Sequence, residues 1–421
     1  PAVFGAANVQ LELVLSTVLA LSREGTRALM LRRQDALRRG DPMLHNLALV
    51  PVWVGSVLSV VVGWAYVAYL APAALWAQSG VAVPVSVALY GLGAWLELWA
   101  EPLHTCALGL DAYVSIRVAM EAGGLAAKAV VTAVLLQPAC LAAMQRCVAA
   151  YVALAPEACA LLAFAWGRVA YGAMVLLVGA VRLRGHARRW WWPTRAAAVW
   201  GDAPTRAFLR VTTAQAALKL VLTEGEKLAA ARLTTLDEQG AYALASNYGS
   251  LVARMLFQPL EESVRLRLSQ GGEAAAWMST LLRLHVLFGT GLVALAPPVA
   301  APFLRLVAGP AWAHAAPILG MYCWYVPVLG VNGVVEAFVQ SVAPARVLRV
   351  YSYVLVAASA VMVGVLASPV AEARMVVANI ASLSVRALAS SAYVAHVSRR
   401  PWDGVVPHGW VWSCLLYTSD A

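Results

Sequence analysis

Charged and amide side chains recur at steps of three or four residues inside long apolar stretches of this sequence. Such spacing places them on one face of a helix, so each set forms a polar stripe. An ionised side chain at the middle of a bilayer costs about 2.5–3.5 kcal/mol, so we expect each stripe to face a bundle interior or a wet cavity. The stripes are Asn8, Glu12, Ser16, Arg23 and Arg27; Glu97, Glu101 and Thr105; Asn247, Ser250, Arg254, Gln258, Glu261 and Arg265; and Asn332, Glu336 and Gln340.

These stripes favour a polar cavity shared by two helical bundles. Guanidinium groups in its wall would attract an anion. Carboxylates on the same face would hold the guanidinium groups in place and keep the cavity from trapping the anion. The candidate binding residues are Arg23, Glu24, Arg27, Glu97, Glu101, Lys128, Glu224, Glu226, Lys227, Arg254, Gln258, Glu261, Glu262, Arg265 and Glu336.

A purely structural interpretation of the same charges stays open. Glu24 with Arg27, Glu261 with Arg265 and Glu224 with Lys227 are spaced three or four residues apart. Pairs at this spacing can simply neutralise one another near a membrane surface.

Catalytic signatures are absent from the sequence. It has no glycine-rich phosphate loop, no zinc-binding HExxH motif and no GxSxG motif, and its 7 histidines match no ligand spacing. We therefore expect neither enzymatic activity, nor a cofactor, nor a bound metal.

The elements that carry the stripes must be membrane-spanning helices. Of the 421 residues, 62% are hydrophobic and 12% charged, where about 45–50% and about 25% are usual. Apolar runs long enough to cross a bilayer recur along the chain, which excludes a water-soluble domain. We predict an all-α polytopic membrane protein with eleven spanning helices, at 5–32, 44–70, 81–110, 114–137, 157–183, 207–236, 240–268, 277–308, 314–341, 347–368 and 373–397.

An internal repeat relates the two halves of the chain. A displacement of 235 residues superposes Glu97 on Asn332 and Glu101 on Glu336, and one of 238 residues superposes Arg27 on Arg265. The repeat is parallel, which predicts two six-helix bundles around a central cavity, with one further helix expected before residue 1. The predicted domains are an N-terminal bundle (1–183), a basic cytoplasmic connection (184–206), a C-terminal bundle (207–400) and a truncated terminal segment (401–421).

Loops rich in Lys and Arg alternate with loops that have almost none, and this pattern predicts the orientation of the protein in the membrane. The 32–43 loop and the 182–210 connection are rich in arginine, whereas the loops near 71–80, 138–156, 237–239 and 369–372 are nearly free of basic residues. By the positive-inside rule the basic loops are cytoplasmic. The net charge of +10 therefore reports membrane orientation, and we expect no nucleic-acid partner.

The central connection also contains Trp190-Trp191-Trp192-Pro193 directly after two arginines. Indole rings prefer the headgroup zone of a bilayer, so an interfacial anchor is the favoured interpretation, with binding of a substrate phosphate as the alternative.

Several motifs resemble the Rft family of oligosaccharide translocation proteins, within the multidrug/oligosaccharidyl-lipid/polysaccharide exporter superfamily. The resemblance rests on the blocks 222–227, 237–242 and 247–263, on Leu21-Ser22-Arg23-Glu24, on Ala100-Glu101-Pro102, on Lys128, and on Asn332-Gly333-Val334-Val335-Glu336. It covers essentially residues 4–400. Family members resemble fourteen-helix proteins, so this chain departs from them at both ends.

The resemblance implies that the protein moves a dolichol-pyrophosphate Man5GlcNAc2 intermediate from the cytosolic to the lumenal leaflet of the endoplasmic reticulum membrane, for N-glycosylation. The partners expected on this basis are that glycolipid and membrane lipids. Two alternatives stay open, a non-transporting accessory factor of the same pathway and an ion-coupled exporter of small amphiphiles.

The arginine asymmetry yields a test of topology. Glycan acceptor sites inserted into the 32–43 loop or the 182–210 connection should remain unmodified in microsomes, because both segments face the cytosol. Acceptor sites inserted into the 138–156 loop serve as the positive control. Glycosylation of the first two would reverse the assigned orientation.

Overall fold

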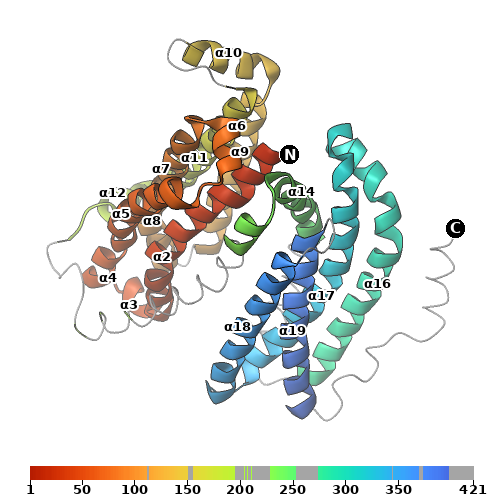
Figure 1. Cartoon of the computed structure of the whole chain (residues 1–421). Coiled ribbons are helices and arrows are strands. Elements are labelled where there is room, and N and C mark those ends of the chain that lie inside the picture. Colours follow the sequence, from red (N-terminus) through yellow and green to blue (C-terminus); the bar gives the residue numbers. More distant parts are fainter. Residues whose placement is uncertain are drawn as a thin grey trace. The chain divides into compact units, whose positions relative to one another are not determined.

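In the computed structural model, every secondary-structure element of the described residues is helical (Figure 1). The structure describes residues 1–110, 113–149, 155–194, 228–252, 274–343, 345–368 and 373–397, together with Ala203, Arg206 and Arg210. Contacts divide the chain into an N-terminal unit, Ala6–Leu228, and a C-terminal unit, which comprises Ala229–Ala421 and Pro1–Gly5.

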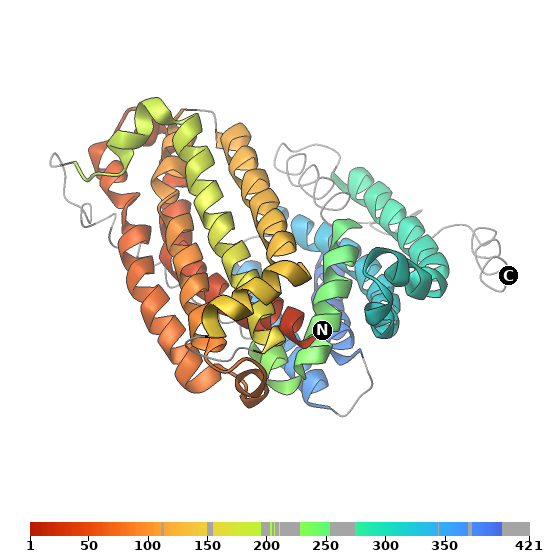
Figure 2. The same ribbon diagram turned by 90° about the horizontal axis from the view of Figure 1, so that it is seen from above.

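The N-terminal unit begins with a π-helical turn, Ala6–Gln10, that leads into the long helix α2. In Figure 2 its helices α5, α7, α11 and α9 run side by side, coloured from orange to yellow-green. The bounds of its elements are α2 Leu11–Arg32, α3 Gln34–Arg38, α4 Pro42–Leu47, α5 Val50–Ala65 with a π-helical end Tyr66–Leu70, α6 Ala73–Ser79, α7 Ala82–Leu98, α8 Glu101–Gly109, α9 Tyr113–Leu135, α10 Pro138–Ala149, α11 Pro156–Arg182 and α12 Arg184–Trp190.

Among its described residues, the C-terminal unit contains four long helices and the shorter α14, against which the first turn of the chain packs. The bounds are α1 Ala2–Gly5, α14 Leu236–Val252, α16 Ala274–Val307, a 3₁₀ turn Pro310–Ala315, α17 Ala316–Val342, α18 Ala345–Ala367 and α19 Arg374–Val397.

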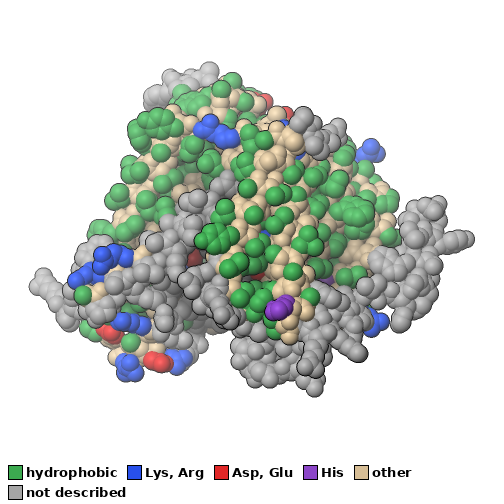
Figure 3. Space-filling view, turned by 60° about the horizontal axis from the view of Figure 1, so that its bottom comes forward, with side chains coloured by type: hydrophobic (Ala, Val, Ile, Leu, Met, Phe, Trp, Pro, Cys, Tyr) green, Lys and Arg blue, Asp and Glu red, His purple; other side chains and the backbone are tan. Residues whose placement is uncertain are grey.

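Nine helices of the described residues are long and apolar enough to cross a membrane. They coincide with nine of the eleven predicted spans, and the remaining two, 207–236 and 240–268, fall largely outside the described residues. Where Figure 3 draws described residues, their coloured side chains are mainly apolar, with Lys and Arg mostly toward the edges. This distribution is typical of helices whose outer surface contacts lipid.

The order of neighbouring helices is the same in both units. In the N-terminal unit α7 packs between α5 and α11, and α11 also packs against α9. In the C-terminal unit α17 packs between α16 and α19, and α19 also packs against α18. This order agrees with the internal repeat. The superposition of the two units about a central cavity stays a prediction.

The turn before α14 lies earlier than the sequence pattern suggests. We predicted a loop at 237–239, but these residues form the first turn of α14, and the chain turns at Thr234-Thr235. The cause is a capping box, in which the Glu238 backbone N–H donates to Thr235 Oγ1 at 3.3 Å and the Thr235 N–H donates to Glu238 Oε2 at 2.7 Å. Shorter helices α6, α10 and α12 likewise occupy segments that we described only as loops.

Arg374, at the start of α19, fixes this cap to the rest of the unit. Its guanidinium donates to both carboxylate oxygens of Glu238, at 3.0 and 2.8 Å. Partial burial opposes ionisation, but the hydrogen bonds from Arg374 and Thr235 keep the pKa of the Glu238 carboxyl below its ordinary value.

Glu238→Gln should therefore lower the free energy of unfolding by about 1 kcal/mol at neutral pH, the usual size of a lost helix cap. Since the pKa of Glu238 is lower in the folded protein, its contribution is present above about pH 4.3 and is lost as the pH falls through the folded value. Thermal unfolding in detergent between pH 3 and 7 measures this. Glu157→Gln, in the exposed first turn of α11, is the matched control. Equal pH profiles for the two variants would contradict the assignment.

Candidate functional site

Glu97 and Glu101 lie on either side of a break between α7 and α8. α7 ends at Leu98 and α8 begins at Glu101, with a turn at Trp99-Ala100. Pro102 explains the break, because it has no N–H to donate to the carbonyl four residues earlier. The sequence predicted one helix over 81–110, and the structure divides it at the position that carries the two carboxylates.

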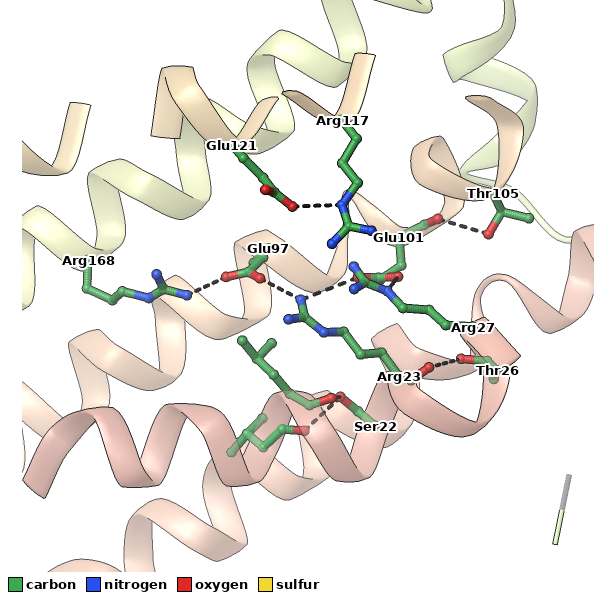
Figure 4. Close-up of polar contacts among 12 residues, drawn as sticks. Ser22, Arg23, Thr26, Arg27, Glu97, Glu101, Thr105, Arg117, Glu121 and Arg168 are labelled. Carbon is green, nitrogen blue, oxygen red and sulfur yellow. Dashed lines mark hydrogen bonds and ion pairs between the residues drawn. The ribbon is translucent and has the colours of Figure 1, made fainter. Parts of the chain in front are cut away.

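Three arginines from two other helices surround these carboxylates (Figure 4). Arg27 of α2 donates to both oxygens of Glu101, at 2.9 and 2.5 Å. Arg23, one turn earlier on α2, donates one nitrogen to Glu97 at 2.5 Å and lies 3.5 Å from Glu101. Arg168 of α11 forms an ion pair with the other oxygen of Glu97. We call these five residues the arginine–glutamate network.

Two glycines allow Arg168 to reach Glu97. α7 and α11 cross closely at Gly93 and Gly172, where a Cβ added to Gly93 would lie 3.0 Å from the Arg168 carbonyl oxygen. Glu97 is one turn beyond Gly93, and Arg168 is one turn before Gly172. Small residues at a helix crossing permit close approach of the backbones. The crossing therefore places the two charged side chains together.

Burial makes the network structurally demanding. The Glu97 and Glu101 side chains are 8% and 4% exposed, and that of Arg168 is 7% exposed. Removing one partner of a buried ion pair leaves an uncompensated charge. The network is thus both a structural connection among α2, α7, α8 and α11 and a fixed arrangement of guanidinium groups.

A cavity of about 340 Å³ adjoins the network within the N-terminal unit. Arg27 and Glu101 belong to its wall, so the network faces an open volume and not only protein. At the rim Arg117 donates to Glu121 at 2.8 Å, an exposed pair that is also visible in Figure 4. The lining residues are Glu24, Thr26, Arg27, Met30, Ala48, Pro51, Glu101, His104, Thr105, Leu108 and Arg117.

The C-terminal unit has a related but simpler arrangement. Arg386 of α19 donates to both oxygens of Glu336 of α17, at 3.0 and 2.7 Å. Asn332 donates its amide to Glu336 at 3.0 Å. Under the repeat Glu336 corresponds to Glu101, and Asn332 replaces the second carboxylate. Neither Glu101 nor Glu336 lies on the lipid face, since both are buried.

Two predicted residues do not join the network. Glu24 is exposed and lines the cavity, and it forms no ion pair within the described part of the chain, because Arg27 pairs with Glu101 instead. The interpretation of Glu24 and Arg27 as a local ion pair is therefore wrong. Lys128 is half-buried on α9 and makes no hydrogen bond or ion pair with a described residue, although the charges of Glu12 and Arg168 act on it.

The other predicted residues lie outside the described part of the chain, so their placement stays a prediction. They are Glu224, Glu226, Lys227, Arg254, Gln258, Glu261, Glu262 and Arg265.

Sequence reasoning missed Arg168 and Arg386, the arginines that reach from α11 to α7 and from α19 to α17. Each stands alone among apolar residues in the middle of a span, which is a usable signal. They are separated by 218 residues, so a search at a displacement of 235–239 does not pair them.

Comparison with known proteins gives a consistent result. The family described as Rft protein matches residues 1–419. The mouse protein named Man(5)GlcNAc(2)-PP-dolichol translocation protein RFT1 is 27% identical over 96% of this chain and 78% of its own length. The Eremothecium gossypii protein of the same name is 29% identical over 86% of this chain and 70% of its own length. The match to the Kluyveromyces lactis protein, at 37% identity, spans only 27% of that relative's length.

One solved structure has a similar fold. The inward closed conformation of the lipid II flippase MurJ aligns with a TM-score of 0.60, covering 99% of this chain and 86% of that one. At 9% identity this similarity concerns the fold alone.

The network yields a test by double-mutant cycle. Glu97→Met should lower the free energy of unfolding by roughly 3–5 kcal/mol, because it leaves the buried guanidinium of Arg168 without its carboxylate. Glu97→Met combined with Arg168→Met should recover much of that loss, since the stranded guanidinium is then gone and Arg23 still faces Glu101. Arg117→Met, in the exposed pair with Glu121, is the control and should cost about 0–1 kcal/mol. Additive losses in the double variant would contradict the network.

Proposed function

The chain belongs to the Rft family, and from this premise we propose that it translocates a lipid-linked oligosaccharide, dolichol-pyrophosphate Man5GlcNAc2, from the cytosolic to the lumenal leaflet of the endoplasmic reticulum membrane for N-glycosylation. The relatives' names supply the substrate. The whole activity is a proposal for this chain, because several of the alignments cover only part of the relatives.

The observation that carries the proposal is the arginine–glutamate network beside a cavity inside a membrane-spanning unit. Its three guanidinium groups face two carboxylates, and a third carboxylate, Glu24, lines the same cavity. An anion entering the cavity would meet the guanidinium of Arg27, which lies in the cavity wall. A pyrophosphate supplies oxygens that match a guanidinium in bidentate fashion.

Carboxylates make such a site reversible. Glu101 accepts hydrogen bonds from Nε and Nη2 of Arg27, and it would exchange with a phosphate oxygen when substrate arrives. Because Glu101 can take the donors back, the anion is released and not trapped. The prenyl tail would remain in lipid while the polar head crosses.

We propose that the chain is organised as two bundles, 1–183 and 207–400, with 184–206 as the cytoplasmic connection and 401–421 as a terminal segment. The sequence contains no nucleotide-binding motif. Transport would therefore be facilitated, or coupled to an ion or a proton through the glutamates.

Reconstitution tests the proposal directly. The full-length protein in vesicles should transfer labelled Man5GlcNAc2 glycolipid between leaflets, measured by its accessibility to an added mannosidase. Arg27→Lys keeps the charge but loses the bidentate geometry. We expect it to insert normally and to slow transfer by about tenfold, equivalent to about 1.4 kcal/mol.

The alternatives predict other outcomes. A protein that exchanges no glycolipid in vesicles, but whose loss lowers glycan occupancy in cells, would be an accessory factor of the pathway. Exchange of small amphiphiles without glycolipid transfer would indicate an exporter.

A further inference from the structure

The segment Trp190–Thr194, at the end of α12, is bound to the fold by side chains of α4. Asn46 Nδ2 donates to the Thr194 carbonyl at 2.8 Å, and its Oδ1 accepts from the Thr194 N–H at 2.7 Å. His45 Nε2 lies 2.9 Å from the Trp192 carbonyl oxygen, and the His45 ring stacks on Trp190 at 4.6 Å. Asn46 is fully buried, so its amide substitutes for the backbone partner that Thr194 lacks.

A second attachment joins the same segment to the helix break. The Trp191 indole N–H donates to the Trp99 carbonyl at 3.2 Å, in the turn between α7 and α8. Trp190 and Trp191 both pack against the cluster that contains Ala100 and Leu103, on the α8 side of the break. The segment therefore packs on the break itself.

These contacts revise the interpretation of the tryptophan run as a plain interfacial anchor. The Trp192 side chain is 71% exposed and fits that role. Trp190 and Trp191 instead pack into the protein. Neighbouring residues of one motif thus serve different purposes.

The geometry of the break determines how the two glutamates face the arginines. Glu97 lies in the last turn of α7 and Glu101 is the first residue of α8, so the angle at Trp99-Ala100 sets their separation. Arg23 lies within ion-pair distance of both carboxylates. Of the two, Glu101 is the one that pairs with Arg27. A change at the break would therefore shift Arg27 in the cavity wall.

We propose that Trp191 and Asn46 are positioning residues of the translocation site. They hold the connection segment on the break and so fix the placement of Glu101 and Arg27, without touching the substrate. The kinetic part of this inference rests on the proposed function, whereas its structural part does not.

The structural test uses the full-length protein in a cysteine-free background, with spin labels at Leu92 and Leu110. These positions are exposed, lie on either side of the break and are 18 residues apart, about 27 Å along a continuous helix. Trp191→Phe removes the indole N–H while keeping an aromatic ring, and it should broaden or shift the measured distance distribution. Trp192→Phe, in the same segment, is the matched control and should not. Identical distributions for the two variants would overturn the proposal, whether or not the protein transports glycolipid.

The kinetic test uses the same variants in the vesicle assay. Trp191→Phe should raise the half-saturating glycolipid concentration by about fivefold, the effect of one lost hydrogen bond. Its yield of folded protein should equal that of Trp192→Phe. In an Arg27→Lys background it should add nothing, because it acts through Arg27. Asn46→Leu, which deletes both hydrogen bonds to Thr194, should reproduce the effect. The positioning role would be overturned if Trp191→Phe weakened transport as much in the Arg27→Lys background as in the wild type, or if transport fell only in proportion to the amount of folded protein. A wild-type protein that transfers no glycolipid would refute only the proposed function.

Discussion

Burying Glu97 and Glu101 inside a membrane-spanning unit requires cations at hydrogen-bond distance, and much of the N-terminal unit is arranged to supply them. The cost of desolvating a carboxylate is offset only when its oxygens are occupied. Arg23 and Arg27 come from α2, and Arg168 comes from α11. Three elements distant in sequence must therefore meet at one point, and the glycine crossing of α7 and α11 is what allows the third to arrive.

In the described part of the C-terminal unit, Glu336 meets the same constraint. It pairs with Arg386 and accepts a hydrogen bond from the neutral amide of Asn332. The order of neighbouring helices nevertheless matches that of the N-terminal unit. Helix order can thus be the same where the buried charges differ, because helix packing depends on side-chain shape and the polar site on a few side chains. Only the described residues of each unit enter this comparison.

The helix break connects local chemistry to the rest of the unit. Pro102 interrupts the hydrogen-bond ladder between the two glutamates, and the Trp191 indole occupies a carbonyl in the interrupted turn. Broken helices are tolerated within a membrane when other groups satisfy the freed backbone positions. The Trp191 indole bonds to the turn at the break, and Asn46 of α4 holds the same tryptophan segment through Thr194, so one set of contacts joins α4 to the break.

The sequence by itself determined the all-helical class, nine of the spans and the choice of Glu97, Glu101 and Glu336 as buried polar residues. Apolar run length and the cost of a charge in lipid are local properties of the chain, which explains this success. Only the tertiary structure decided the partners. Arg27 pairs with Glu101, 74 residues away, and not with Glu24 three residues before it, because the approach of α2 to α8 is set by packing. Arg168 and Arg386 acquired their roles in the same way, through helix crossings that no spacing rule encodes.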